Sequence, residues 1–92
     1  MPAAPLPAVS VVIPAHNNRP LLARFLPLLL AALKGYSAPT EVLVVDDASS
    51  DDSADFLTRN YPGVRVIRSE RQLGFSGACN LGGQAAQHAA LL

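Results

Sequence analysis

The feature that most constrains this chain is an apolar run, Glu41–Val45, that ends abruptly in two adjacent carboxylates, Asp46 and Asp47. The run is short and rich in β-branched side chains, which predicts a strand buried on both faces of a sheet. The two carboxylates follow where such a strand would leave the sheet, and in open α/β sheets ligands bind at that carboxyl edge. The alternative is that Asp46 ends the strand and Asp47 solvates a turn.

The composition is that of a small folded domain. The chain has 92 residues and no net charge, and half of its residues are hydrophobic. It can therefore bury a modest core and is not a disordered tail. The balanced charge gives no electrostatic case for nucleic acid as a partner. Cys79 is the only cysteine, which excludes a disulfide framework within the chain and a zinc cluster.

We expect neither a membrane span nor a signal peptide within these 92 residues. No segment approaches the ~20 apolar residues needed to span a bilayer, and residues 1–8 lack the features of a signal peptide, so we expect a flexible lead-in. The C-terminal residues Ala89–Leu92 have no helix stop signal, and they fit either the end of a helix or the start of another strand. We therefore expect a fragment of a longer parent. Its expected setting is cytoplasmic, with any attachment to the inner membrane face made by parts absent here.

The chain alternates between strand and helix patterns. Besides Glu41–Val45, β-branched runs predict strands over Val9–Ile13 and Val64–Arg68, and helical spacing follows each of the three. The order β-α-β-α-β-α implies a parallel sheet with crossover helices. We expect an α/β fold with a Rossmann-like parallel sheet of about three strands and flanking helices.

The first helix is expected to begin at a cap, Asn17 or Asn18, and to end at Gly35. Pro27 lies inside it. Because proline lacks a backbone donor, it is expected to kink or restart this helix.

The other two helices are less sharply bounded. The second is expected to be capped by Ser49 or Ser50 and broken by Pro62-Gly63. A glycine-containing loop, Arg71–Gly77, precedes the third helix. That helix is expected to present one apolar face, made of Ala78, Leu81, Ala85, Ala89 and Leu92.

Three loops should converge at the carboxyl edge of the sheet: Pro14–Asn17, Asp46–Ser49 and Arg71–Gly77. Together they offer carboxylates, an imidazole, amides, backbone donors and a cation. This inventory suits a nucleotide, since a carboxylate accepts from a base N–H while backbone N–H groups or a cation meet phosphate.

Each of these residues also has an ordinary structural explanation. His16 alone is more often a plain loop histidine, and Asn17 is a good helix cap. Gly74 and Gly77 serve tight turns or close packing equally well. Only their combination at one edge favours a site.

Three segments resemble the motifs of family 2 glycosyltransferases, in order and spacing. Val9–Asn17 resembles the opening strand, Glu41–Ser53 the acidic motif of the second strand, and Gln72–Gly82 the third motif. The resemblance covers nearly all of residues 9–92. It implies the N-terminal, nucleotide-binding half of a GT-A fold, truncated before the metal-binding and catalytic motifs.

The resemblance also implies an activity. The parent would be an inverting enzyme that transfers a sugar from a nucleotide-sugar, UDP- or dTDP-linked, to an unknown acceptor. A divalent metal, Mn or Mg, is implied for the parent, with no ligand assigned in this chain. The fragment itself is expected to be inactive because it lacks a general base and a complete metal site.

Residue roles follow from the matching positions. The resemblance implies that Pro14 and Ala15 line the base and ribose pocket and that His16 stacks on the base. Asp47 matches the carboxylate that accepts from the base, while Asp46 supports the turn or the ribose. The residues so assigned to nucleotide binding are Pro14, Ala15, His16, Asn17, Asp46, Asp47, Gly74 and Asn80.

Departures from the family pattern affect the phosphate side of the site. Asn80 matches a motif asparagine near the phosphates, but Cys79 stands where many members have arginine and Gln72 where asparagine is usual. Losing that arginine removes a phosphate contact, for which Arg71 is the candidate replacement.

Other functional classes fit these residues less well. A dinucleotide-binding domain needs G-x-G-x-x-G after its first strand, and Pro14–Asn17 contains no glycine. A receiver-like signalling domain carries its acidic pair after the first strand and a phosphoacceptor aspartate after the third, whereas Ile67–Glu70 has none. That domain and a non-catalytic nucleotide-binding or interaction module stay as alternatives. Self-association through an exposed sheet edge is also expected.

Overall fold

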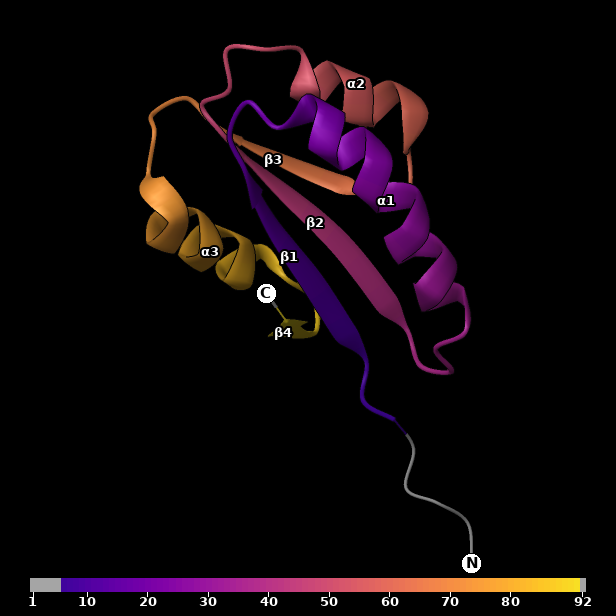
Figure 1. Ribbon diagram of the computed structural model, residues 1–92. Coiled ribbons are helices and arrows are strands. Elements are labelled where there is room, and N and C mark those ends of the chain that lie inside the picture. Colours follow the sequence, from indigo (N-terminus) through magenta and orange to yellow (C-terminus); the bar gives the residue numbers. More distant parts are fainter. Residues whose placement is uncertain (1–5, 92) are drawn as a thin grey trace, which may run out of the picture.

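Strands and helices alternate along the chain in the computed structural model, which describes residues 6–91 (Figure 1). The strands form one sheet in which every neighbouring pair is parallel. The Rossmann-like α/β class is therefore confirmed. In chain order the elements are β1 (Val9–Ala15), α1 (Arg19–Lys34), β2 (Thr40–Asp47), α2 (Ser53–Asn60), β3 (Arg65–Ser69), α3 (Gly74–Ala85) and β4 (Ala89–Leu91).

The strand order is β3-β2-β1-β4. The chain moves outward from β1 to β3, and α3 then carries it back across the sheet to the other side of β1. This is the order of doubly wound nucleotide-binding domains. In receiver-type domains β1 lies between β2 and β3 instead, so the topology disfavours the receiver alternative.

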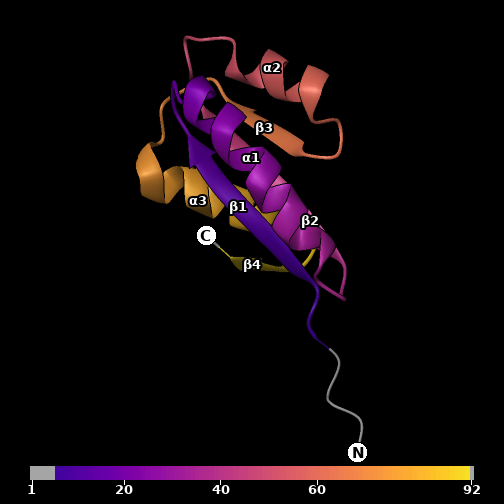
Figure 2. The same ribbon diagram turned by 45° about the vertical axis from the view of Figure 1, so that its right-hand side comes forward.

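The central strand β2 is buried on both faces, as the sequence predicts. Val42 and Val44 pack in one cluster with residues of α1 and α2, while Leu43 and Val45 pack in a second cluster with α3. The helices accordingly cover opposite faces of the sheet (Figure 1, Figure 2). Burying each such side chain contributes ~1.5–3 kcal/mol, so β2 organises both halves of the core.

Two strands run further than the sequence predicts. β1 continues through Pro14 to Ala15, and β2 continues through both carboxylates to Asp47. Asp46 and Asp47 are thus the last residues of the strand, paired with Arg68 and Ser69 of β3. The ladder to β3 extends β2 to this point.

Helix α1 is one uninterrupted element despite Pro27, so the predicted restart there is wrong. Pro27 lies on the exposed side, where the carbonyl left without an intrahelical donor can turn toward water. Asn18 occupies the N-cap position, and Gly35 follows the last helical residue as predicted.

Helix α2 begins later than predicted. Its N-cap position is Asp52, not Ser49 or Ser50. The backbone N–H of Ser53 donates to the Asp51 carboxylate at 3.0 Å. The Asp51 side chain thus accepts the first N–H of the helix, and Ser49 and Ser50 make contacts in the preceding turn instead.

Helix α3 is shifted toward the N-terminus relative to the prediction. It begins at Gly74, inside the predicted loop, and ends at Ala85. Ala89 therefore lies in β4 and not on a helix face, and β4 pairs with Val9–Val11. Of the two options for the C-terminal residues, the start of a strand is correct. Leu92 lies outside the described residues, as do residues 1–5 of the predicted lead-in.

A polar cluster fastens β4 to the sheet at the amino edge. The Glu41 carboxylate accepts hydrogen bonds from the Ser10 hydroxyl at 2.9 Å, the Gln87 N–H at 3.0 Å and Arg65 at 3.0 Å. The His88 N–H donates to the Ser10 hydroxyl at 3.2 Å. Burial raises the pKa of Glu41, but the hydrogen bonds from Gln87, Arg65 and Ser10 outweigh it and hold the pKa below its usual range.

This cluster gives stability a defined pH dependence. Because the folded-state pKa of Glu41 is lowered, its contribution is complete above its ordinary pKa of about 4.3 and is lost as pH falls through the folded value. The Glu41→Gln variant should therefore be less stable than wild type at pH 7, and the gap should close in acid. Urea unfolding at several pH values measures it, with Glu70→Gln, an exposed glutamate, as control. A gap that stays constant or widens in acid would contradict this assignment.

Gly82 lies where α3 packs closely against the sheet. A Cβ at this position would overlap the side chains of Val12 and Val45, so Gly82→Ala should lower the free energy of unfolding by ~1–3 kcal/mol. Gly83 is the matched control because its Cβ position faces open space. Gly83→Ala should raise stability by up to ~1 kcal/mol through helix propensity. Equal urea midpoints for the two variants would show that no close contact exists.

Candidate functional site

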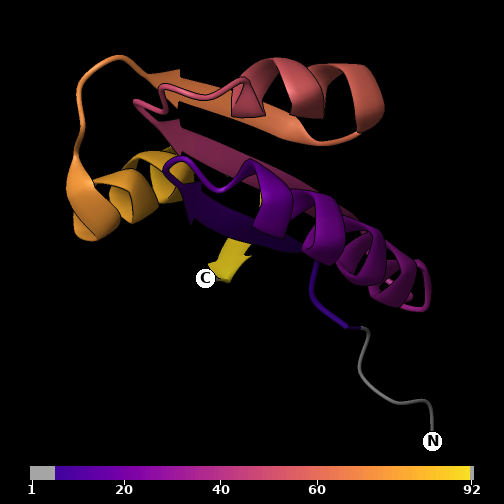
Figure 3. The ribbon, with the colours of Figure 1, turned by 45° about the horizontal axis from the view of Figure 1, so that its top comes forward.

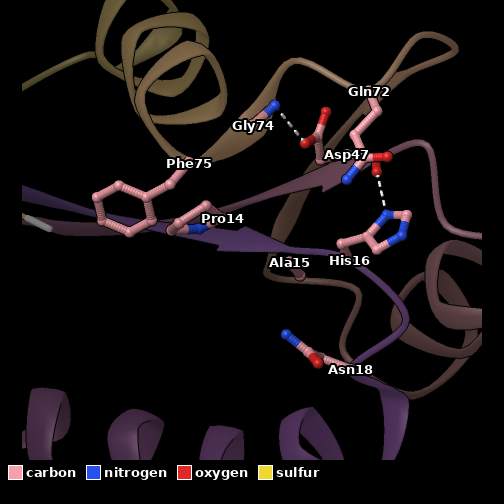
Figure 4. A pocket seen from close by; sticks show the side chains of 8 residues that line it. All are labelled: Pro14, Ala15, His16, Asn18, Asp47, Gln72, Gly74 and Phe75. Atoms are coloured by element: carbon pink, nitrogen blue, oxygen red, sulfur yellow. Dashed lines mark hydrogen bonds between the residues drawn. The ribbon is translucent and has the colours of Figure 1, made fainter.

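The turns that follow β1, β2 and β3 meet at one edge of the sheet, as the sequence predicts (Figure 3). They enclose an open pocket of about 200 Å³. Figure 4 shows this pocket and its lining. The lining residues are Pro14, Ala15, His16, Asn18, Asp47, Gln72, Gly74 and Phe75.

Asp47 joins β2 to the start of α3. One carboxylate oxygen accepts the N–H of Leu73 at 2.7 Å, and the other accepts the N–H of Gly74 at 2.9 Å. The side chain is almost fully buried, and its negative charge lies at the positive end of a helix. Gly74 has φ +77°, a conformation that other residues rarely adopt, so glycine permits this approach.

His16 forms the next part of the wall. Its Nδ1 lies 2.6 Å from the carbonyl oxygen of Asp47. Because a carbonyl only accepts, Nδ1 carries the proton. Nε2 then accepts from the side-chain amide of Asn17, 3.3 Å away. These contacts fit the Nδ1–H tautomer and hold the ring against the end of β2.

Asp46 points to the opposite face of the sheet from Asp47. It is fully buried, and one of its oxygens accepts from Arg68 at 3.1 Å. Among residues 6–91, its other carboxylate oxygen has no hydrogen-bond partner. Arg68 also reaches the carbonyl oxygen of Ser49 at 3.4 Å, so the ion pair supports the turn after β2.

Asp51 stabilises the end of the turn between β2 and α2. The hydrogen bond from the Ser53 hydroxyl holds the pKa of Asp51 below its usual range, although burial opposes this. The other oxygen accepts the backbone N–H of Arg19 at 3.4 Å. The start of α1 is thereby tied to the start of α2.

Phe75 and Gln72 complete the pocket, and neither was assigned a binding role from sequence. Phe75 is 70 % exposed although it is a large apolar side chain. Figure 4 shows its ring beside Pro14, across the pocket from His16. An exposed aromatic ring at a pocket rim is a surface on which a planar group can stack. The sequence signal was present, since Phe75 is the aromatic residue of the third loop segment.

The predicted site residues divide into two groups. Five of the predicted nucleotide-binding residues line the pocket: Pro14, Ala15, His16, Asp47 and Gly74. Asn17, Asp46, Asn80 and the proposed phosphate contact Arg71 lie outside its lining, with Asn80 and Arg71 exposed. The binding role of every one of these residues stays a prediction.

In the part of the chain that the structure describes, no group of three His, Cys, Asp or Glu side chains gathers closely enough to hold a metal ion. None of the described helices is long and apolar enough to cross a membrane.

Comparison with known proteins identifies relatives of this sequence. The model of the family "Glycosyl transferase family 2" matches residues 10–92. An undecaprenyl-phosphate 4-deoxy-4-formamido-L-arabinose transferase of Serratia proteamaculans is 46 % identical over 65 residues, which are 68 % of this chain and 20 % of the relative. An uncharacterised protein of Mycobacterium tuberculosis is 41 % identical over 76 residues, 82 % of this chain and 22 % of the relative. The chain therefore spans about a fifth of the length of these relatives.

Among solved structures, the fold is similar to that of a mannosyltransferase from Pyrobaculum calidifontis, determined in complex with GDP-Man and Mn2+. The TM-score is 0.72 and the sequence identity 24 %, over 96 % of this chain and 28 % of the other. At this identity the likeness establishes the fold.

The two bonds to Asp47 predict a structural cost for its neutral isostere. An asparagine side chain would retain one acceptor and direct its NH₂ group at a backbone N–H, so Asp47→Asn should lower the free energy of unfolding by ~1–3 kcal/mol. Urea unfolding measures this. Asp55→Asn, at an exposed site in the first turn of α2, should cost less than about 1 kcal/mol. Equal losses would contradict the special role of Asp47 in holding α3.

Proposed function

Because this chain belongs to glycosyltransferase family 2, we propose that it is the donor-nucleotide-binding part of an inverting glycosyltransferase. The enzyme would transfer a sugar from a nucleotide-sugar to an acceptor. The Serratia proteamaculans relative is named for undecaprenyl phosphate, which supports a lipid phosphate as acceptor. We also expect a cytoplasmic setting.

The observation that carries this proposal is the Asp47 carboxylate in the wall of an open pocket. Each oxygen accepts one backbone N–H, and a carboxylate oxygen can accept a second. A ring N–H of uracil, thymine or guanine is a suitable further donor. The rings of Phe75 and His16 offer flat surfaces for the base, and the amide of Gln72 can bond its carbonyl oxygens.

We expect the donor to be UDP- or dTDP-linked. The P. calidifontis enzyme was solved with GDP-Man, and guanine also presents a ring N–H, so GDP is the necessary comparison. Adenine lacks a ring N–H on its Watson–Crick edge. The pocket should therefore discriminate against ADP.

A divalent metal is proposed for the whole enzyme, supported by the Mn2+ in the P. calidifontis complex. The described residues do not form a site that fits it: Asp46 pairs with Arg68, and Asp47 is bonded to α3. A bound metal would supply charge stabilisation to the leaving diphosphate. The residues of this chain would bind and orient the nucleotide, and we propose that they do not catalyse transfer alone.

A nucleotide titration followed by amide NMR shifts tests the proposal. UDP or dTDP should shift the amides of His16, Asp47, Gly74 and Phe75, with GDP weaker and ADP weaker still. Each nucleotide is added with and without Mn2+. Absence of any shift at millimolar nucleotide, or shifts confined to the opposite sheet edge, would refute nucleotide binding at this pocket.

Two exposed apolar side chains give a matched pair of variants for that titration. Phe75→Ala removes the ring at the pocket rim and should weaken affinity about tenfold, given the ~1–3 kcal/mol of base–aromatic stacking. Leu28→Ala removes a side chain of similar exposure, 72 %, on α1 outside the pocket lining. Its affinity should equal that of wild type. Equal affinities for all three proteins would remove Phe75 from the site.

A further inference from the structure

Asn17 occupies the turn between β1 and α1 in an unusual backbone conformation. Its φ is +53°, in the left-handed region that asparagine adopts more readily than most residues other than glycine. Its side chain neither lines the pocket nor occupies the N-cap position of α1, which belongs to Asn18.

The polar atoms of Asn17 instead engage the turn after β2. Its side-chain oxygen accepts the Ser50 N–H at 2.8 Å, the Ser50 hydroxyl at 3.2 Å and the Asp51 N–H at 3.2 Å. Its own backbone N–H donates to the hydroxyl of Ser49 at 2.9 Å. One residue thus makes four hydrogen bonds to a turn more than thirty positions away in sequence.

The orientation of the Asn17 amide follows from these contacts. Two of the groups beside its oxygen are backbone N–H donors, so the acceptor end must face them and the NH₂ group faces the other way. There it reaches Nε2 of His16 at 3.3 Å, while Nδ1 of His16 donates to the carbonyl oxygen of Asp47. Asn17 therefore contacts both the turn after β2 and the ring that forms the pocket wall.

We infer that Asn17 is a positioning residue that locks the turns after β1 and β2 together and so fixes His16 relative to Asp47. This inference rests on the proposed function, in which those two side chains receive a nucleotide base. A site held in its binding geometry loses less conformational entropy on binding than one that must be ordered by the ligand. Asn17 acts on the nucleotide through this lock and without touching it.

Two substitutions separate the parts of this role. Asn17→Gly removes the whole side chain and suits the positive φ, so it introduces no backbone strain. Asn17→Asp keeps an acceptor for the Ser50 and Asp51 N–H groups and removes the donor to His16. Asn60→Ala is the control, because the side chain of that exposed asparagine bonds within α2, to the Phe56 carbonyl.

The experiment combines amide hydrogen exchange with UDP titration by NMR. In wild type and Asn60→Ala, the Ser50 and Asp51 amides should be protected relative to that of Gly63, a residue of the exposed turn after α2. In Asn17→Gly, the Ser50 and Asp51 amides should exchange at least tenfold faster, while sheet amides such as Val44 keep their exchange rates. This variant should also bind UDP about tenfold more weakly. Asn17→Asp should keep the protection.

The lock is refuted if Ser50 and Asp51 stay protected in Asn17→Gly, or if Asn17→Asp exposes them as fully as glycine does. The positioning role is refuted if protection is lost and UDP affinity is unchanged. If wild type binds no nucleotide, the proposed function fails. The exchange data then still decide whether Asn17 joins the two turns.

Discussion

The site depends on the paired hydrogen bonds between the Asp47 carboxylate and the first N–H groups of α3. A buried carboxylate is costly unless donors compensate its charge, and here the compensation comes from the N-terminus of the crossover helix. The bonds fix where α3 begins. They also place Gly74 and Phe75 opposite the turn after β1. The hydrogen bonds that compensate the Asp47 charge thus also position the part of the pocket lining that α3 contributes.

The turn after β2 is stabilised from the other face of the sheet. Asp46 turns to the opposite face, pairs with Arg68 and supports the turn that follows β2. Adjacent residues of a strand point to opposite faces, so Asp46 and Asp47 contact different layers of the structure. One carboxylate holds the crossover helix and lines the pocket, while the other supports the loop to which Asn17 bonds.

Much of this could be predicted from sequence because it follows from local pattern. The β-branched run of β2 and the stop at Gly35 depend on residues close in the chain. The convergence of the three loops at one edge follows from the alternation of strands and helices, which the sequence also shows. The remainder depends on distant partners. β4 has three residues and forms a strand because it pairs with β1. Asn17 fits a helix cap by sequence, and only the structure shows that its side chain bonds Ser50 instead.

The same limit applies to Phe75. The sequence shows an aromatic residue in the third loop, but only the tertiary arrangement shows that its ring is exposed beside Pro14. We propose that a nucleotide base lies between this ring and His16. Intermolecular NOEs from the base protons of bound UDP test it most directly. We expect contacts to the side chains of Phe75 and His16. Contacts instead to Leu30 and Leu33, which line a hollow at the opposite edge, would contradict binding of the base at this site.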